Sequence, residues 1–222
     1  MWTLYHHPSA AGSRKIRVAL LELGLECKVE IESYWLRRNE FMRLNVAGEV
    51  PVLETDENLM VVGDQAIGEF LDEVKPDKTL LGNSLEQRSE TRRLLQWFDG
   101  KFAAEVTSNL AGEKLMKRLL RNGEPFAPAI RAGIANIHYH LDYIGWLCER
   151  RTWLAGPDFS LADIAAAAHI SLIDYLGDVP WDDHEDARTW YMRVKSRPAF
   201  RPLLNEVMAG VTPAEHYAAL DF

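Results

Sequence analysis

Four side chains that can donate hydrogen bonds to an anion lie close together near the N-terminus. They are His6, His7, Ser9 and Ser13, and the apolar spacing that follows predicts a helix opening at Ser13. The first turn of a helix adds partial positive charge, so this segment could stabilise a thiolate. The plainer alternatives are that Ser13 caps the helix, that Ser9 is a loop hydroxyl and that the histidines pack at a strand end.

The remaining histidines and cysteines form no recognisable metal or redox motif. His138 and His140 are two residues apart on an expected helix and point to different faces, while His138 and Asp142 supply only two ligands. Cys27 and Cys148 are far apart and lack a Cys-x-x-Cys spacing, which indicates two buried thiols in a reducing compartment. We therefore expect no metal and no resident cofactor.

Two features could bind a protein partner. Lys114, Lys117, Arg118 and Arg121 form a basic stripe at helical spacing. Such a stripe is usually a solvated face, but it could also receive an acidic peptide. Trp35 stands in an expected connector and is either an exposed aromatic anchor or a core residue.

The expected secondary structure differs between the two parts of the chain that carry these residues. The first part predicts a strand, a helix, a half-buried strand with period two, a hairpin and a helix, in the order Thr3–Tyr5, Ser13–Leu23, Cys27–Ile31, Val50–Glu54 with Leu59–Val62, and Gln65–Val74. The first strand, helix and second strand imply a parallel crossover. The sum is a small mixed sheet with helices against it, which we assign to residues 1–76.

Residues 77–84 are turn-rich and are expected to be a linker, and residues 85–222 are expected to be entirely helical. Ser84 and Gln87 form a capping box that opens a long helix, and a second long helix at about Ala129–Arg150 should pack antiparallel to it. Ser160 and Asp163 form another box, so Asp163 is structural before it is catalytic.

Composition limits the classes of partner. The 222 residues carry 25 basic and 33 acidic side chains, a net charge of −8, which disfavours nucleic acid and anionic membranes. The N-terminus has no secretory signal pattern, and the apolar stretch Ile164–Ile173 is shorter than the ~20 residues of a membrane span. We expect a cytoplasmic protein.

Several motifs together resemble the glutathione S-transferase family from end to end. They are Ser13–Leu23, Val50-Pro51-Val52-Leu53, Asp64-Gln65-Ala66-Ile67, Phe159–Asp163 and Arg197-Pro198-Ala199-Phe200. The resemblance implies a thioredoxin-like α/β N-terminal domain, an all-α C-terminal domain and a homodimer through the first long helices. More narrowly, four segments look like a bacterial, alphaproteobacterial branch of the family that binds the division tubulin FtsZ: Leu94–Asp99, Gly112–Arg118, Leu176–Trp181 and His216–Phe222.

The resemblance also assigns a glutathione site. Val50 would pair through its main chain with the cysteinyl unit beside a cis Pro51, and Asp64 would hold the γ-glutamyl ammonium. An ordinary helix cap is the alternative for Asp64. Gln65 stands where the family usually has a hydroxyl, which would weaken this end of the site.

The sequence departs from the family pattern at the residue that would activate the thiol of glutathione. Counted back from Arg17, the position of the family's catalytic tyrosine falls at or beside His6, and Tyr5 is one residue away from it. The positions of the family's catalytic serine fall on Ala10 and Ala11, and that of its catalytic cysteine falls on Gly12. Only Ser9, Ser13 and His6 remain as candidate catalytic donors.

Two functions follow from this pocket. The chain is either an active transferase that conjugates glutathione, as a co-substrate, to a small electrophile, or a binding module that has lost the thiol donor. The second would present Trp35, Lys114, Lys117, Arg118 and Asp221 to a partner such as FtsZ. We favour the second, because the missing donor removes the step that matters most to the reaction.

Overall fold

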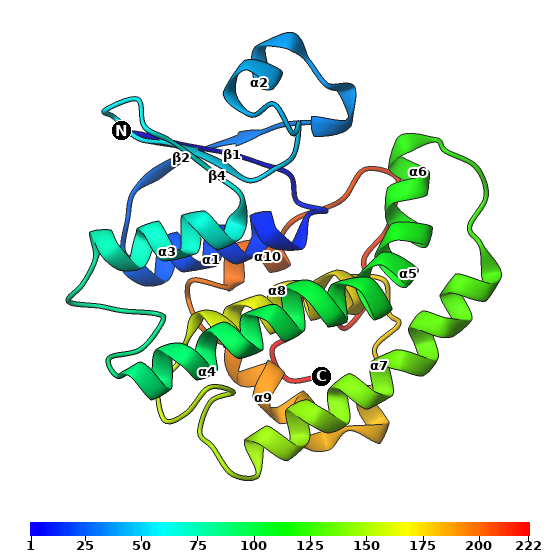
Figure 1. Cartoon of the computed structure of the whole chain (residues 1–222). Coiled ribbons are helices and arrows are strands. Elements are labelled where there is room, and N and C mark those ends of the chain that lie inside the picture. Colours follow the sequence, from blue (N-terminus) through cyan, green and yellow to red (C-terminus); the bar gives the residue numbers. More distant parts are fainter. The chain divides into compact units, whose positions relative to one another are not determined.

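A four-stranded sheet in the order β2-β1-β3-β4 organises the N-terminal part of the chain. Its strands are β1 (Trp2–His6), β2 (Cys27–Ile31), β3 (Val52–Glu54) and β4 (Met60–Val62). β1 and β2 are parallel, which confirms the expected crossover, and β1–β3 and β3–β4 are antiparallel. Figure 1 shows α1 (Ala11–Leu23) and α3 (Asp64–Val74) on one face and α2 (Asn39–Leu44) on the other.

This computed structural model describes all of residues 1–222, in two compact units, Met1–Leu80 and Leu81–Phe222. The first unit is the expected thioredoxin-like α/β domain and the second is entirely helical, so the predicted fold is confirmed. The first unit also contains η1 (Tyr34–Leu36), a single 3₁₀ turn after β2.

Three local predictions in the first unit are wrong. Helix α1 begins at Ala11 after the N-cap residue Ala10, so Ser13 does not cap it. Asp64 is the first residue of α3 and Gly63 is its N-cap. β2 was expected to bury its apolar side chains, yet Val29 and Ile31 are exposed, because β2 is an edge strand with no neighbour on its outer side.

The second unit opens with a long helical segment that runs from Leu85 to Leu120. Its successive parts are α4 (Leu85–Leu95), η2 (Gln96–Thr107), α5 (Ser108–Ala111), η3 (Gly112–Met116) and α6 (Lys117–Leu120). η2 and η3 have the wider π-helical winding, which is rare over more than one turn. The capping box of Ser84 and Gln87 opens α4 as predicted.

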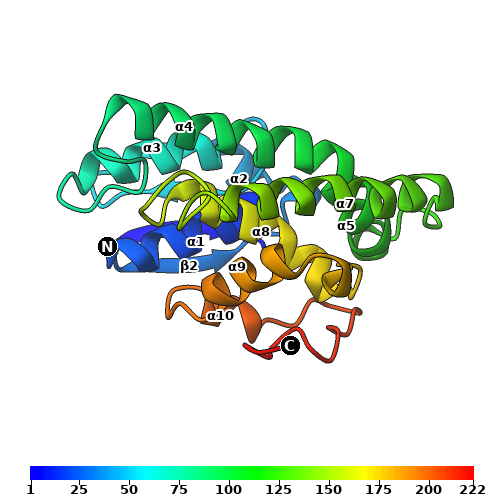
Figure 2. The ribbon, with the colours of Figure 1, turned by 90° about the horizontal axis from the view of Figure 1, so that it is seen from below.

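The second long helix, α7 (Ala127–Cys148), packs along η2 and α5, and the two long helical segments lie side by side in Figures 1 and 2. The core helix of this unit is α8 (Leu161–Tyr175), whose residues are all buried. Asp163 closes the capping box with Ser160 and also accepts hydrogen bonds from Leu154 N–H and Trp190 Nε1 at 2.9 Å each. Its predicted structural role is thereby confirmed.

The chain ends with η4 (Trp181–Asp183), α9 (Glu185–Lys195), α10 (Arg201–Leu204) and a tail without regular structure. The tail packs within the second unit, since Ala214 N–H donates to Tyr175 C=O at 2.9 Å and Tyr217 OH donates to Leu203 C=O at 3.1 Å. None of the helices has the length and apolar character needed to cross a membrane.

Candidate functional site

The loop between β1 and α1 holds both candidate serines, and each is committed to a local hydrogen bond. Ser9 Oγ lies 2.7 Å from His7 Nδ1. Ser13 Oγ accepts a hydrogen bond from His7 N–H at 3.2 Å. Ser9 and Ser13 are 5% and 0% exposed, so neither hydroxyl is displayed to solvent.

Burial fixes the charge state of the two histidines. It lowers the pKa of His7 to about 4 and, with nearby Arg17 adding repulsion, that of His6 to about 3. Both rings are therefore neutral at pH 7. Ser9 N–H donates to His7 Nδ1 at 3.2 Å, so Nδ1 is the acceptor nitrogen of the neutral ring and the Ser9 hydroxyl hydrogen also points toward it. His6 is 3% exposed and its Nδ1 has no hydrogen-bond partner.

Tyr5 lies on the other face of the sheet from His6, because alternate strand residues point to opposite faces. Its ring is 6.2 Å from that of Phe41 on α2, and its hydroxyl donates to Glu54 Oε2 at 3.1 Å. Burial and this contact with Glu54 raise the pKa of Tyr5. Tyr5 is therefore turned away from the loop that leads into α1.

The residues assigned to the glutathione site are brought to one region of the first unit. The Val50–Pro51 peptide bond is cis, and Val50 is half-buried just before β3. Gly63 N–H donates to Pro51 C=O at 3.1 Å, which joins the start of α3 to the segment that carries the cis bond. Gln65, at the second position of α3, is exposed.

Asp64 has a partner within the chain. Its Oδ2 lies 2.5 Å from Nζ of Lys15, a residue of α1 that is 1% exposed. Asp64 also lies against the first turn of α1, since a Cβ built on Gly12 would be 2.9 Å from Asp64 Cγ. An incoming ammonium group would have to share this carboxylate with Lys15.

The arrangement can still bind a small anion through the first turns of α1 and α3, where helix N–H groups and partial positive charge are available. It offers less to a thiol. The serine hydroxyls are buried and engaged, Tyr5 is on the other face of the sheet, and the imidazoles are neutral. Among the candidate donors, the ring of His6 is the one whose Nδ1 has no hydrogen-bond partner.

Trp35, in η1, is half-buried. Its ring meets that of His7 edge-on at 4.7 Å and that of Tyr34 at 5.2 Å. The same His7 that engages the two serines therefore supports one side of Trp35, and the other side remains partly accessible.

The basic stripe is mostly used inside the second unit. Lys114 Nζ lies 2.6 and 2.7 Å from the two carboxylate oxygens of Asp178, and Lys117 Nζ lies 2.6 Å from Glu113 Oε2. Arg118 is exposed. Carboxylates within the chain therefore neutralise two of the four members of the stripe, and Arg121 is exposed like Arg118.

Phe222, the last residue, packs against an aromatic ring and two cationic side chains. The Phe222 ring lies 5.4 Å from that of Trp181, and Lys195 Nζ and Arg188 Cζ lie 4.1 and 5.4 Å from its centroid. Asp221, the residue before it, is exposed.

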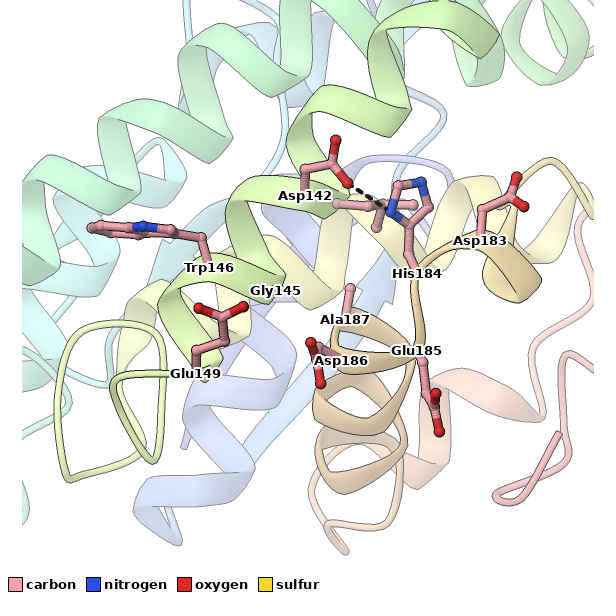
Figure 3. A pocket seen from close by; sticks show the side chains of 10 residues that line it. Asp142, Gly145, Trp146, Glu149, Asp183, His184, Glu185, Asp186 and Ala187 are labelled. Carbon is pink, nitrogen blue, oxygen red and sulfur yellow. Dashed lines mark ion pairs between the residues drawn. The ribbon is translucent and has the colours of Figure 1, made fainter.

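A hollow of about 270 Å³ lies between α7 and the start of α9. Figure 3 shows Asp142, Trp146 and Glu149 on α7 across from the segment Asp183–Asp186. His184 links the two sides, because its Nδ1 lies 3.1 Å from Asp142 Oδ1 and its Nε2 lies 2.9 Å from His138 Nδ1.

The sequence indicates the pair His138 and Asp142, whereas the role of His184, which contacts both, depends on the tertiary fold. These side chains bond to one another rather than converge on a point. The chain has no group of three or more His, Cys, Asp or Glu side chains placed to hold a metal ion.

The family model of the glutathione S-transferase N-terminal domain matches residues 12–74. FtsZ-localized protein A of Caulobacter vibrioides is 49% identical over 223 residues, which cover 99% of this chain and 98% of that protein.

Two solved structures cover the chain from end to end. A glutathione S-transferase from Rhodospirillum rubrum is 52% identical, with a TM-score of 0.99 and 100% of both chains covered. FzlA from C. crescentus is 49% identical, with a TM-score of 0.96, covering 100% of this chain and 99% of that one.

Proposed function

This chain belongs to the glutathione S-transferase family, and from that premise we propose that it is a binding protein for the division tubulin FtsZ rather than a robust enzyme. The observation that carries the proposal is the 49% identity to FtsZ-localized protein A along 99% of this chain and 98% of that protein. The aligned region includes both units, so it contains all the residues that we propose for partner binding.

The pocket supports the same choice. A free thiol with a pKa of ~8.5 is mostly protonated at neutral pH, so a transferase needs a donor beside the sulfur. Ser9 and Ser13 are buried and engaged by His7, and Asp64 is paired with Lys15. Glutathione could still be a ligand through Val50 and the start of α3, but its thiol would gain little reactivity there.

The residues that we propose for partner binding lie on both units, and we treat each unit separately. On the first unit the contact is Trp35, whose ring is partly accessible. On the second unit it is Arg118 and Asp221, which are exposed, together with Lys114 and Lys117, which are half-buried and ion-paired. An acidic partner would compete with Asp178 and Glu113 for the two lysines.

The proposal includes a homodimer through the long helices of the second unit. Four aromatic side chains gather on α7 and η2, with Trp97–Tyr143 and Tyr143–Trp146 ring centroids at 4.5 and 6.0 Å. Trp146 and Tyr139 are 48% and 57% exposed, which is unusual for large aromatic residues outside an interface. A cytoplasmic location is also proposed, and the two free thiols of Cys27 and Cys148 fit a reducing compartment.

Co-sedimentation with polymerised FtsZ tests the proposal. The wild-type protein should pellet with the polymers, and Trp35→Glu and Asp221→Lys should each reduce the pelleted fraction. Matched controls are Phe126→Glu, at an apolar residue that is 58% exposed, and Asp182→Lys, at an exposed acid. Absence of wild-type pelleting would refute FtsZ binding, and unchanged pelleting of the two variants would refute the proposed contacts.

The second candidate function is an active transferase. Membership of the glutathione S-transferase family and the cis peptide bond before Pro51 favour it. Calorimetry with glutathione and an assay with a generic electrophile separate the two. Steady conjugation that is abolished by Ser9→Ala or Ser13→Ala would overturn the preference for a binding protein.

A further inference from the structure

Strand β2 has an open outer edge with exposed apolar side chains. Val29 and Ile31 are 47% and 67% exposed, although both are β-branched residues that normally pack in sheets. Lys28 and Glu30 alternate with them and form an exposed ion pair at 2.6 Å. Natural proteins protect such an edge with a covering segment, a bulge, proline or charged side chains; β2 has Lys28 and Glu30, no proline, and no strand paired on its outer side.

The main chain of β2 is oriented to receive another strand. Glu32 N–H donates to His6 C=O of β1 at 2.8 Å. Because successive residues of a strand direct their main-chain groups to opposite sides, those of Lys28 and Glu30 also face β1. The N–H and C=O groups of Cys27, Val29 and Ile31 therefore face away from the sheet.

The sequence of β2 is complementary to itself when it is read in the opposite direction. Centred on Val29, it has a cation on one side and an anion on the other. If two copies pair antiparallel about Val29, each Lys28 lies opposite Glu30 of the other copy and Cys27 lies opposite Ile31. Charged and apolar residues then match across the pair, and the outward main-chain groups meet in the hydrogen-bonded positions.

We propose that β2 pairs with β2 of a second copy of this chain, antiparallel and about a two-fold axis through Val29. The contact joins two four-stranded sheets into one continuous sheet and sets the side chains of Val29 and Ile31 beside Val29 and Cys27 of the other copy on the same face. It involves the N-terminal unit and is separate from the helical dimer face proposed above. Nothing in it depends on FtsZ or glutathione.

Thiol crosslinking at the axis tests this contact directly. In a Cys27→Ser, Cys148→Ser background, Val29→Cys should give a covalent dimer with a short bismaleimide reagent. Val62→Cys is the matched control, because Val62 is a 39% exposed valine on the opposite edge strand β4. The Val62→Cys protein should crosslink at least tenfold more slowly.

Charge exchange then tests the register. Adding Lys28→Glu or Glu30→Lys to the Val29→Cys protein places like charges across the axis and should slow crosslinking roughly tenfold in each variant alone. An equimolar mixture of these two variants, one of them enlarged by a tag, should recover the rate as a mixed dimer. The double variant Lys28→Glu/Glu30→Lys keeps the complementarity and should crosslink like its parent.

These outcomes separate a wrong proposal from a misfolded variant. The double variant and the mixture contain the same substitutions as the slow single variants, so their recovery shows that the chains fold. Equal rates for Val29→Cys and Val62→Cys, or a mixture that is as slow as either variant alone, would overturn the β2 contact.

Discussion

His7 Nδ1 lies 2.7 Å from the hydroxyl of Ser9, and the main-chain N–H of the same His7 donates to Ser13 Oγ at 3.2 Å. One residue therefore engages both hydroxyls that could have served a thiol. The loop is organised around His7, and its polar groups satisfy one another instead of a ligand.

This relationship predicts a structural role for Ser13. Ser13→Ala should lower the free energy of unfolding by about 1 kcal/mol, because the His7 N–H loses its acceptor in a part-buried position. Urea denaturation measures the change. Ser89→Ala, at an exposed serine of α4, is the control and should stay within about 0.5 kcal/mol. Equal effects in the two variants would show that the His7 bond contributes nothing.

The buried His6 predicts a pH dependence of stability. Its pKa is about 3 in the folded chain and an ordinary 6.5 when unfolded, so folding favours the neutral ring. The stability is complete above about pH 6.5 and declines as the pH falls toward 3. Between pH 7 and pH 5 this histidine alone should cost about 2 kcal/mol.

Chemical denaturation at the two pH values checks this expectation. His6→Gln should show a smaller loss between pH 7 and pH 5 than the wild-type protein, whatever its stability at pH 7. His138→Gln is the control, since His138 has a hydrogen-bonded and only half-buried ring. A pH response that is identical in His6→Gln and wild type would contradict the burial argument.

Asp163 is expected to be among the most sensitive positions of the second unit. Asp163→Ala should lower the free energy of unfolding by about 4 kcal/mol, because buried donors on Leu154, Trp190 and Ser160 lose their acceptor together. Thermal and urea unfolding measure it. The exposed Asp158 lies in the loop just before α8, and Asp158→Ala should change stability by less than about 0.5 kcal/mol.

Phe222 is expected to hold the tail rather than the whole unit. Phe222→Ala should raise amide hydrogen exchange in residues 214–222, because the contacts with Trp181 and Lys195 disappear. The global free energy of unfolding should fall by only about 1 kcal/mol, since the ring is not fully buried. Exchange that is unchanged in the tail would show that other contacts suffice.

The helix starts were the most predictable part of the fold, because their chemistry is local. The Ser84–Gln87 and Ser160–Asp163 boxes each lie within four consecutive residues, and both occur as expected. Ser13 was misassigned, because a hydroxyl near a helix start can equally accept from a preceding loop. Choosing between the two requires the path of the chain through His7.

The sites were less predictable where partners are distant in sequence. Lys114 is neutralised by Asp178, 64 positions away, and Lys15 by Asp64 from another helix. The pairing of Lys117 with Glu113 at i,i+4 was visible in the sequence, but nothing local indicated that the lysine prefers it to solvent. Val29 is exposed because β2 is an edge strand. The sequence of β2 alone does not show this, since the position of a strand in the sheet follows from the order of all four strands.

The close approach of Gly12 and Asp64 restricts how this protein could change in the course of evolution. A Cβ at position 12 would lie 2.9 Å from Asp64 Cγ and 3.0 Å from its Cβ. Gly12→Cys alone would therefore collide with a side chain that Lys15 anchors. Substitutions at position 12 are therefore coupled to residue 64, and a larger side chain at position 12 would require a smaller one at position 64.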